Sequence, residues 1–209
     1  MIAGPNGAGK SSLQSLLRQA HLFDCSVVNI DALEIDIDTL PADPLRYAGE
    51  IAKRTDKKFR ELCEEAISKK NDFAFECNLR AEQVKYLGLF EEAGYNINLV
   101  FIWLDSLELS IDRVKMRVLK GGHHVGNESI KINYTEGLKN LDEYFTNWNN
   151  VYIINNSKDL SDKTSEEIRL PLIIFIEEGE VRHVTRNINT DILNRDFPNI
   201  MQSFHQINI

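Results

Sequence analysis

Short apolar runs alternate with amphipathic segments along most of the chain. The apolar and β-branched runs predict five strands, at residues 1–3, 26–31, 73–76, 98–104 and 151–155. Apolar residues that recur at steps of three and four predict helices at residues 12–19, 47–70 and 82–93. The run at 98–104 (NLVFIWL) is the most apolar of the strands, as expected of a strand at the centre of a parallel sheet.

This alternation of strands and helices predicts an α/β fold, in which helices cover both faces of a parallel sheet. The pattern changes after Pro171, where residues 172–176 and 180–185 flank a Glu-Glu-Gly turn and predict an antiparallel hairpin. We expect this hairpin at the edge of the sheet. Residues 1–170 then form the main domain, and residues 171–209 form a hairpin and helix appended to the same domain.

Composition and charge narrow the class of protein. The 209 residues carry a formal charge of −8, which disfavours binding to the phosphates of nucleic acid. No apolar run approaches the roughly 18 residues needed to span a membrane, and the first residues do not resemble a signal peptide. Cys25, Cys63 and Cys77 lie far apart, which favours reduced core cysteines over a disulfide framework or a zinc site. We therefore expect a cytoplasmic protein with neither nucleic-acid nor membrane partners.

A phosphate-binding loop follows the first predicted strand directly. The sequence matches G-x-x-x-x-G-K-[ST] at every position, over Gly4, Pro5, Asn6, Gly7, Ala8, Gly9, Lys10 and Ser11, and Ser12 continues into a helix. Glycines let backbone N–H groups surround a phosphate, Lys10 reaches the β- and γ-phosphate oxygens, and the Ser11 hydroxyl is a ligand for Mg²⁺. The loop predicts a P-loop NTPase fold that binds ATP and Mg²⁺.

Other segments distinguish among the classes of P-loop protein. Residues 156–159 (Asn-Ser-Lys-Asp) have serine where the base-reading motif of GTPases has lysine, and no signature segment of ABC-class ATPases is present. A small kinase, whose second substrate supplies the nucleophile, fits what remains. The amides of Asn155 and Asn156 at the end of the fifth strand suit adenine recognition and a simple turn equally well.

Several carboxylates follow predicted strands, where ligands of doubly wound folds bind. Asp31 comes at the end of the second strand and is the preferred candidate for the base that orients the acceptor hydroxyl; capping of a turn is the alternative. Asp36 and Asp38 lie further along the same loop. Glu76 ends the third strand, with Arg80 four residues later. This pair could bind the acceptor or hold a metal-bound water, or be an ordinary strand end.

A basic segment follows the central strand. Arg113, Lys115, Arg117 and Lys120 lie within residues 113–124 without an acidic residue, and two glycines follow. Basic residues on a helix before a glycine joint are typical of a closing lid that neutralises phosphate charge. A solvated basic helix face is the alternative.

Five segments in this order, AGPNGAGKSS, NID, FAFECNLR, RVKMRVLKGGHHV and NNS, resemble the zeta-toxin family of P-loop kinases, and more closely its branch of predicted ABC-type ATPases. The resemblance covers roughly residues 1–157 and implies ATP-dependent phosphorylation of a nucleotide sugar, UDP-N-acetylglucosamine in the best-understood members. It implies that Lys10 and Ser11 hold ATP and Mg²⁺, that Asp31 is the base and that Glu76 contacts the acceptor. It also implies that Arg113 and Arg117 neutralise the transferred phosphoryl group.

The chain departs from the family at two segments. Cys77 and Asn78 stand where the family often has two threonines, and Gly126 and Asn133 fall where it commonly has a proline and an arginine-rich run. We expect an ATP- and Mg²⁺-dependent kinase with Lys10, Asp31, Arg113 and Arg117 as catalytic residues, acting on a small-molecule acceptor held by Glu76 and Arg80. A non-kinase ATPase module and an inactive toxin-like protein with an antitoxin partner remain the alternatives.

Overall fold

The computed structural model describes residues 1–33, 43–122, 124–158, 170–186 and 188–207. Seven strands lie in one sheet: β1 (Ile2–Ala3), β2 (Val27–Asn29), β3 (Ala74–Cys77), β4 (Asn98–Trp103), β5 (Asn150–Asn155), β6 (Leu172–Glu177) and β7 (Glu180–Val184). The α-helices are α1 (Lys10–Gln19), α2 (Pro44–Lys69), α3 (Ala81–Val84), α4 (Leu87–Glu92), α5 (Leu107–Leu119), α6 (Asn127–Tyr144), α7 (Thr190–Asp196) and α8 (Pro198–Ile207). Two 3₁₀ turns, η1 (Ile30–Ala32) and η2 (Phe145–Asn147), follow β2 and α6.

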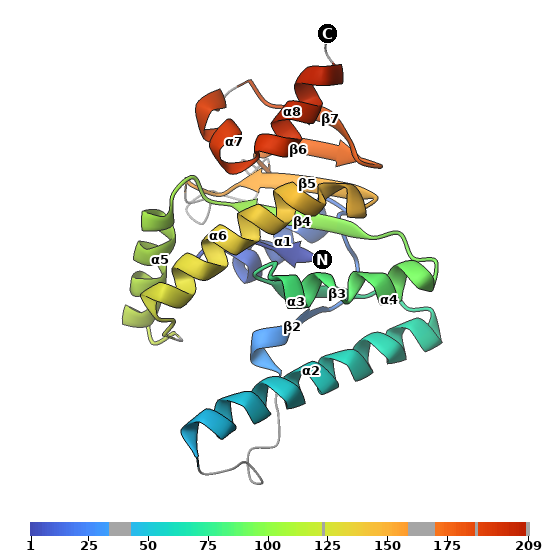
Figure 1. The fold of residues 1–209 in the computed structure, drawn as a ribbon, viewed down its shortest axis with the longest axis vertical. Coiled ribbons are helices and arrows are strands. Elements are labelled where there is room, and N and C mark those ends of the chain that lie inside the picture. Colours follow the sequence, from blue (N-terminus) through green and yellow to red (C-terminus); the bar gives the residue numbers. More distant parts are fainter. Residues whose placement is uncertain (34–42, 123, 159–169, 187, 208–209) are drawn as a thin grey trace.

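The sheet confirms the predicted α/β class. Its strand order is β2-β3-β1-β4-β5-β6-β7, in which the first five strands are parallel and β6 and β7 pair in antiparallel fashion. α6 crosses one face of the sheet and α1 lies behind the other, while α7 and α8 lie by the hairpin (Figure 1). The carboxyl ends of the five parallel strands therefore meet at one edge, which is where β1 enters the phosphate loop.

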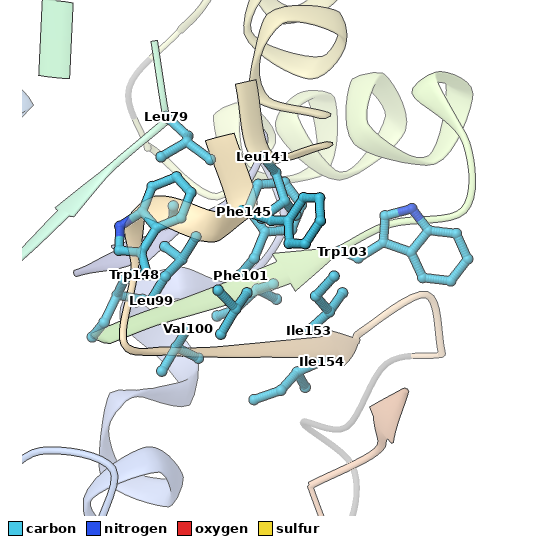
Figure 2. Packing of buried hydrophobic residues seen from close by; sticks show 14 of the residues in the cluster. Leu79, Leu99, Val100, Phe101, Trp103, Leu141, Phe145, Trp148, Ile153 and Ile154 are labelled. Carbon is cyan, nitrogen blue, oxygen red and sulfur yellow. The ribbon is translucent and has the colours of Figure 1, made fainter. Parts of the chain in front are cut away.

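The central strand β4 carries the middle of the hydrophobic core. Every residue from Leu99 to Trp103 is buried, because helices cover both faces of this strand. Leu99 and Phe101 point toward Leu141 and Phe145 on the side of α6, and Val100 points to the opposite side (Figure 2). The predicted central position of this strand is confirmed.

Two predicted elements differ in extent. The strand predicted at 26–31 ends at Asn29, and the chain turns through η1 before it reaches the segment 34–42, which lies outside the described residues. The helix predicted at 82–93 is divided into α3 and α4 at Lys85 and Tyr86. Tyr86 is buried against Phe59 of α2, and Lys85 and Tyr86 both donate hydrogen bonds to Asp56, so tertiary contacts with α2 interrupt the helix.

Candidate active site

The phosphate loop joins β1 to α1 at the carboxyl end of the sheet. Gly9 precedes the first turn of α1 with φ of 89°, a left-handed conformation that favours glycine. A Cβ atom at this position would lie 2.7 Å from Nδ2 of Asn156, so the loop has no room for a side chain. The first N–H groups of α1 have no partners within the helix and are directed at the loop, as in an anion-binding helix N-terminus.

Lys10 lies within this loop. Its ammonium group donates hydrogen bonds to the carbonyl oxygens of Gly4 at 2.8 Å and Pro5 at 3.2 Å, and to Oδ1 of Asn78 at 3.0 Å. The lysine thus curls over its own loop, at the position from which it would reach the phosphates of a nucleotide.

Ser11 of the phosphate loop lies next to Glu76 of β3. The Ser11 hydroxyl lies 3.0 and 3.1 Å from the two carboxylate oxygens of Glu76. Gln14, one turn further along α1, donates to the same carboxylate at 3.0 Å, and Asn29 of β2 donates from the other side at 2.5 Å. Glu76 is only 5% exposed, so these neutral donors compensate for burial of its charge.

The strand register explains why these groups meet. Glu76 of β3 is paired with Ile2 of β1 and with Asn29 of β2, so that its side chain lies between the phosphate loop and the end of β2. The sequence alone predicted Glu76 and Ser11 but missed Gln14 and Asn29. The spacing of Ser11 and Gln14, three residues apart on one helix face, was the available signal for Gln14.

The two predicted arginines of the basic segment occupy different environments. Arg113 is half-buried and donates to the carbonyl oxygens of Gly7 at 3.5 Å and Ser157 at 3.3 Å, so it joins the phosphate loop to the end of β5. Arg117 lies one turn later on α5 and is exposed. The structure therefore brings Arg113 into contact with the loop.

Asn6 fastens α5 and α6 to the phosphate loop. Ser110 of α5 donates to the Asn6 carbonyl oxygen at 2.6 Å, and Asn133 of α6 donates to the Asn6 side-chain oxygen at 2.7 Å. All three residues are buried. These hydrogen bonds join the first half of α5 and the first half of α6 to the phosphate loop.

Asn156, which follows β5, contacts the backbone of the phosphate loop. Its amide donates to the Ala8 carbonyl oxygen at 2.7 Å, and its buried Oδ1 has no hydrogen-bond partner among the residues that the structure describes. This contact with the loop backbone is neither adenine recognition nor a simple turn, the two roles that the sequence suggested for this amide. Sequence spacing gave no sign of the contacts that Asn6 makes, because Ser110 and Asn133 each lie more than 100 positions away from it.

The remaining predicted residues lie away from these contacts or cannot be placed. Arg80, at the start of α3, lies 3.4 Å from a carboxylate oxygen of Glu136 and 3.9 Å from one of Glu82. The backbone of Asp31 is in η1, but its side chain is outside the described part of the structure, as are Asp36 and Asp38. Within the described ranges no three His, Cys, Asp or Glu side chains gather as a metal site.

Comparisons with known proteins agree with this geometry. The family model described as Zeta toxin matches residues 1–165. An uncharacterized protein of Haemophilus influenzae is 30% identical over 132 residues, which are 63% of this chain and 88% of that protein.

Two solved structures share the fold at low sequence identity. The PezAT chromosomal toxin–antitoxin system of Streptococcus pneumoniae has a TM-score of 0.50 at 16% identity, covering 99% of this chain and 84% of that one. AvrRxo1-ORF1:AvrRxo1-ORF2 with sulphate ions has a TM-score of 0.59 at 15% identity, covering 94% of this chain and 62% of that one. With the family model spanning most of its length, the chain belongs to the zeta toxin family.

Proposed function

We propose that this protein is an ATP- and Mg²⁺-dependent small-molecule kinase that transfers the γ-phosphate of ATP to a sugar hydroxyl. The observation that carries the proposal is the contact of Ser11 with the buried Glu76, beside Lys10, at the N-terminus of α1. Membership of a family of P-loop kinase-like toxins supports the same reaction class.

The residues around Ser11 fit a magnesium ion. A hydroxyl and a carboxylate are oxygen donors of the kind that Mg²⁺ selects, and this ion takes few protein ligands because it keeps waters and phosphate oxygens. Ser11 would be a direct ligand, and Glu76 would hold the ion or one of its waters. When bound, Mg²⁺ neutralises charge on the β- and γ-phosphates. Gln14 and Asn29 orient the Glu76 carboxylate for this role.

The catalytic roles follow from charge and position. Lys10 and the N-terminus of α1 bind the phosphates of ATP, and Asp31 orients the acceptor hydroxyl and accepts its proton. Arg113, which already contacts the loop, and Arg117, which is exposed on the same helix, stabilise negative charge on the transferred phosphoryl group.

The proposed acceptor is inferred from the resemblance to the zeta-toxin family, and the proposed protein partner is inferred from a structural relative. We propose a nucleotide sugar such as UDP-N-acetylglucosamine as acceptor, bound with the help of Arg80. One structural relative is described as a toxin–antitoxin system, which supports an antitoxin protein as partner. No helix among the described residues has the length and apolar content needed to cross a bilayer. A kinase that uses ATP would work in the cytoplasm, and we propose that location.

The experiment is transfer of labelled γ-phosphate from ATP–Mg²⁺ to a panel of nucleotide sugars, nucleosides and cell metabolites. We expect a labelled sugar with the wild-type protein, and a rate about 10²–10⁴-fold lower with Asp31→Asn, the usual contribution of a positioned base. Both proteins should bind ATP equally well. Release of free phosphate alone would indicate an ATPase, and bound ATP without turnover would indicate an inactive toxin-like protein.

A further inference from the structure

The turn that follows β3 has a strained backbone. Leu79 has φ of 61° although it is not a glycine, and its side chain is completely buried. A bulky residue in the left-handed region is sterically unfavourable, so the surrounding structure must hold the turn in place. Strain of this kind is commonly retained where it sets the position of a functional group.

Helix α6 holds this turn in place at two points. Asn140 donates its side-chain amide to the Leu79 carbonyl oxygen at 2.8 Å. One turn earlier, Gly137 lies so close that a Cβ atom there would come within 2.8 Å of the Asn78 carbonyl oxygen. The backbone of Asn78 and Leu79 is therefore fixed by a glycine and an amide of the same helix.

The result of this arrangement is the position of the Asn78 side chain. Cys77 is paired with Ala3, so Asn78 stands beside the first residue of the phosphate loop. Its side chain is 6% exposed, and its Oδ1 accepts a hydrogen bond from Lys10 at 3.0 Å. The strained turn thus places the Asn78 carboxamide beside the Lys10 ammonium group, which would contact the β- and γ-phosphates.

A carboxamide has two functions at such a place, because its oxygen accepts hydrogen bonds and its nitrogen donates two. We propose that Asn78 makes the site selective for a nucleoside triphosphate over a diphosphate. Its Oδ1 keeps Lys10 in position, and its Nδ2 donates to the γ-phosphate once the triphosphate is bound. This inference rests on the proposed nucleotide-binding function and adds a selectivity residue to it.

The test compares a non-hydrolysable triphosphate, AMP-PNP, with ADP by calorimetric titration in the presence of Mg²⁺. In Asn78→Ala we expect ADP to bind about threefold more weakly, because Lys10 loses a partner that positions it for the β-phosphate. AMP-PNP should bind about tenfold more weakly, because the bond from Nδ2 to the charged γ-phosphate is lost as well. In Asn78→Asp the AMP-PNP affinity should fall further, because a carboxylate repels the γ-phosphate and competes for Lys10.

Asn71→Ala is the matched control, since this exposed asparagine at the end of α2 is remote from the loop. Thermal unfolding of each variant establishes that it is folded, and Asn78→Leu, which keeps the side-chain volume and removes both the donor and the acceptor, replaces any variant that is not. The inference would be overturned if the wild-type protein binds both nucleotides and the folded Asn78 variants keep the same ratio of AMP-PNP affinity to ADP affinity. Failure of the wild-type protein to bind either nucleotide would instead overturn the proposed function.

Discussion

Glu76 shows how the surroundings of one side chain narrow its role. An acceptor-binding carboxylate would be expected to face an open site, whereas Glu76 is buried and receives hydrogen bonds from Ser11, Gln14 and Asn29. A carboxylate fixed in this way beside the serine of a phosphate loop is better suited to holding a metal ion or its water than to binding a sugar. Of the two roles that the sequence left open for Glu76, we therefore propose that it holds the metal ion or its water.

The first prediction concerns the effect of Mg²⁺ on ATP affinity in Glu76→Gln. We expect the wild-type protein to bind ATP more tightly with Mg²⁺ than in EDTA. In the variant, the ratio of ATP affinity with Mg²⁺ to ATP affinity in EDTA should be about tenfold smaller, because the substitution removes the charge that anchors the ion. The ATP affinity in EDTA should stay close to that of the wild type.

Calorimetric titration with and without EDTA measures both values, and Glu92→Gln, an exposed carboxylate at the end of α4, is the control. If Glu76→Gln keeps the full Mg²⁺ effect but weakens only the acceptor, Glu76 belongs to the acceptor site after all.

Local spacing was enough to identify the residues of the phosphate loop, but not the residues that contact it from other elements. The phosphate loop is eight adjacent residues whose types are dictated by backbone wrapping around a phosphate. Its supports come from other elements: Asn29, Asn78, Asn133 and Asn156 lie far away in sequence and resemble ordinary turn or surface residues. Only the fold shows that Asn78, Asn133 and Asn156 contact one loop. It also shows that Asn29 contacts Glu76, which in turn accepts from Ser11 of that loop.

At the scale of elements, the buried strands were predicted well because they are continuous apolar runs. Helix α6 was not predicted, although Ile130, Tyr134, Leu138 and Leu141 recur at helical steps. Its sequence also holds asparagines, a threonine and Gly137, which have low helix propensity. Asn133, Gly137 and Asn140 are buried because they face the phosphate loop and the turn at Asn78 and Leu79. Since polar and small residues thus lie on the buried face of the helix, the amphipathic pattern is weak in the sequence.

The second prediction concerns the junction of α2 with α3 and α4. Asp56 of α2 accepts hydrogen bonds from Lys85, at 2.7 Å, and from the Tyr86 hydroxyl, and these two donors lower the pKa of Asp56 below its ordinary value of 3.8. A carboxyl whose pKa is lower in the folded state stabilises the fold above its unfolded pKa, and this contribution is lost as pH falls through the folded value.

Asp56→Asn should therefore reduce stability at pH 7 by about 0.5 kcal/mol, since the ion pair is partly exposed. Urea unfolding from pH 7 down to pH 3 should show that the difference in free energy of unfolding between wild type and variant becomes smaller as the pH decreases. A gap that widens toward acid pH would contradict the assigned direction of the pKa shift.

At the scale of the whole molecule, the C-terminal segment continues the main sheet. β6 pairs with β5, and Trp103 of the central strand β4 donates its indole N–H to Asp196 of α7 at 2.8 Å. Both side chains are buried, and Arg195 lies 2.6 Å from the other oxygen of Asp196. We infer that the appended hairpin and helices unfold together with residues 1–170 as one domain.

The third prediction tests this unity. Asp196→Ala leaves the buried Trp103 N–H without its acceptor, so we expect a loss of about 2 kcal/mol in the free energy of unfolding. Far-ultraviolet circular dichroism and tryptophan fluorescence should report one coincident transition in both proteins. Separate transitions in the wild-type protein would show that the C-terminal segment is an independent unit.

Nucleotide binding at the phosphate loop is the premise of every functional role assigned above, and one measurement tests it most directly. ATP with Mg²⁺ is titrated calorimetrically into the wild-type protein, Lys10→Ala and the control Lys57→Ala, whose lysine is exposed on α2. We expect saturable binding to the wild type and to Lys57→Ala, and affinity about 10- to 100-fold lower in Lys10→Ala, because a charged hydrogen-bond donor to the phosphates is lost. Absence of saturable binding to the wild type, or equal affinity in Lys10→Ala, would contradict a nucleotide site at this loop.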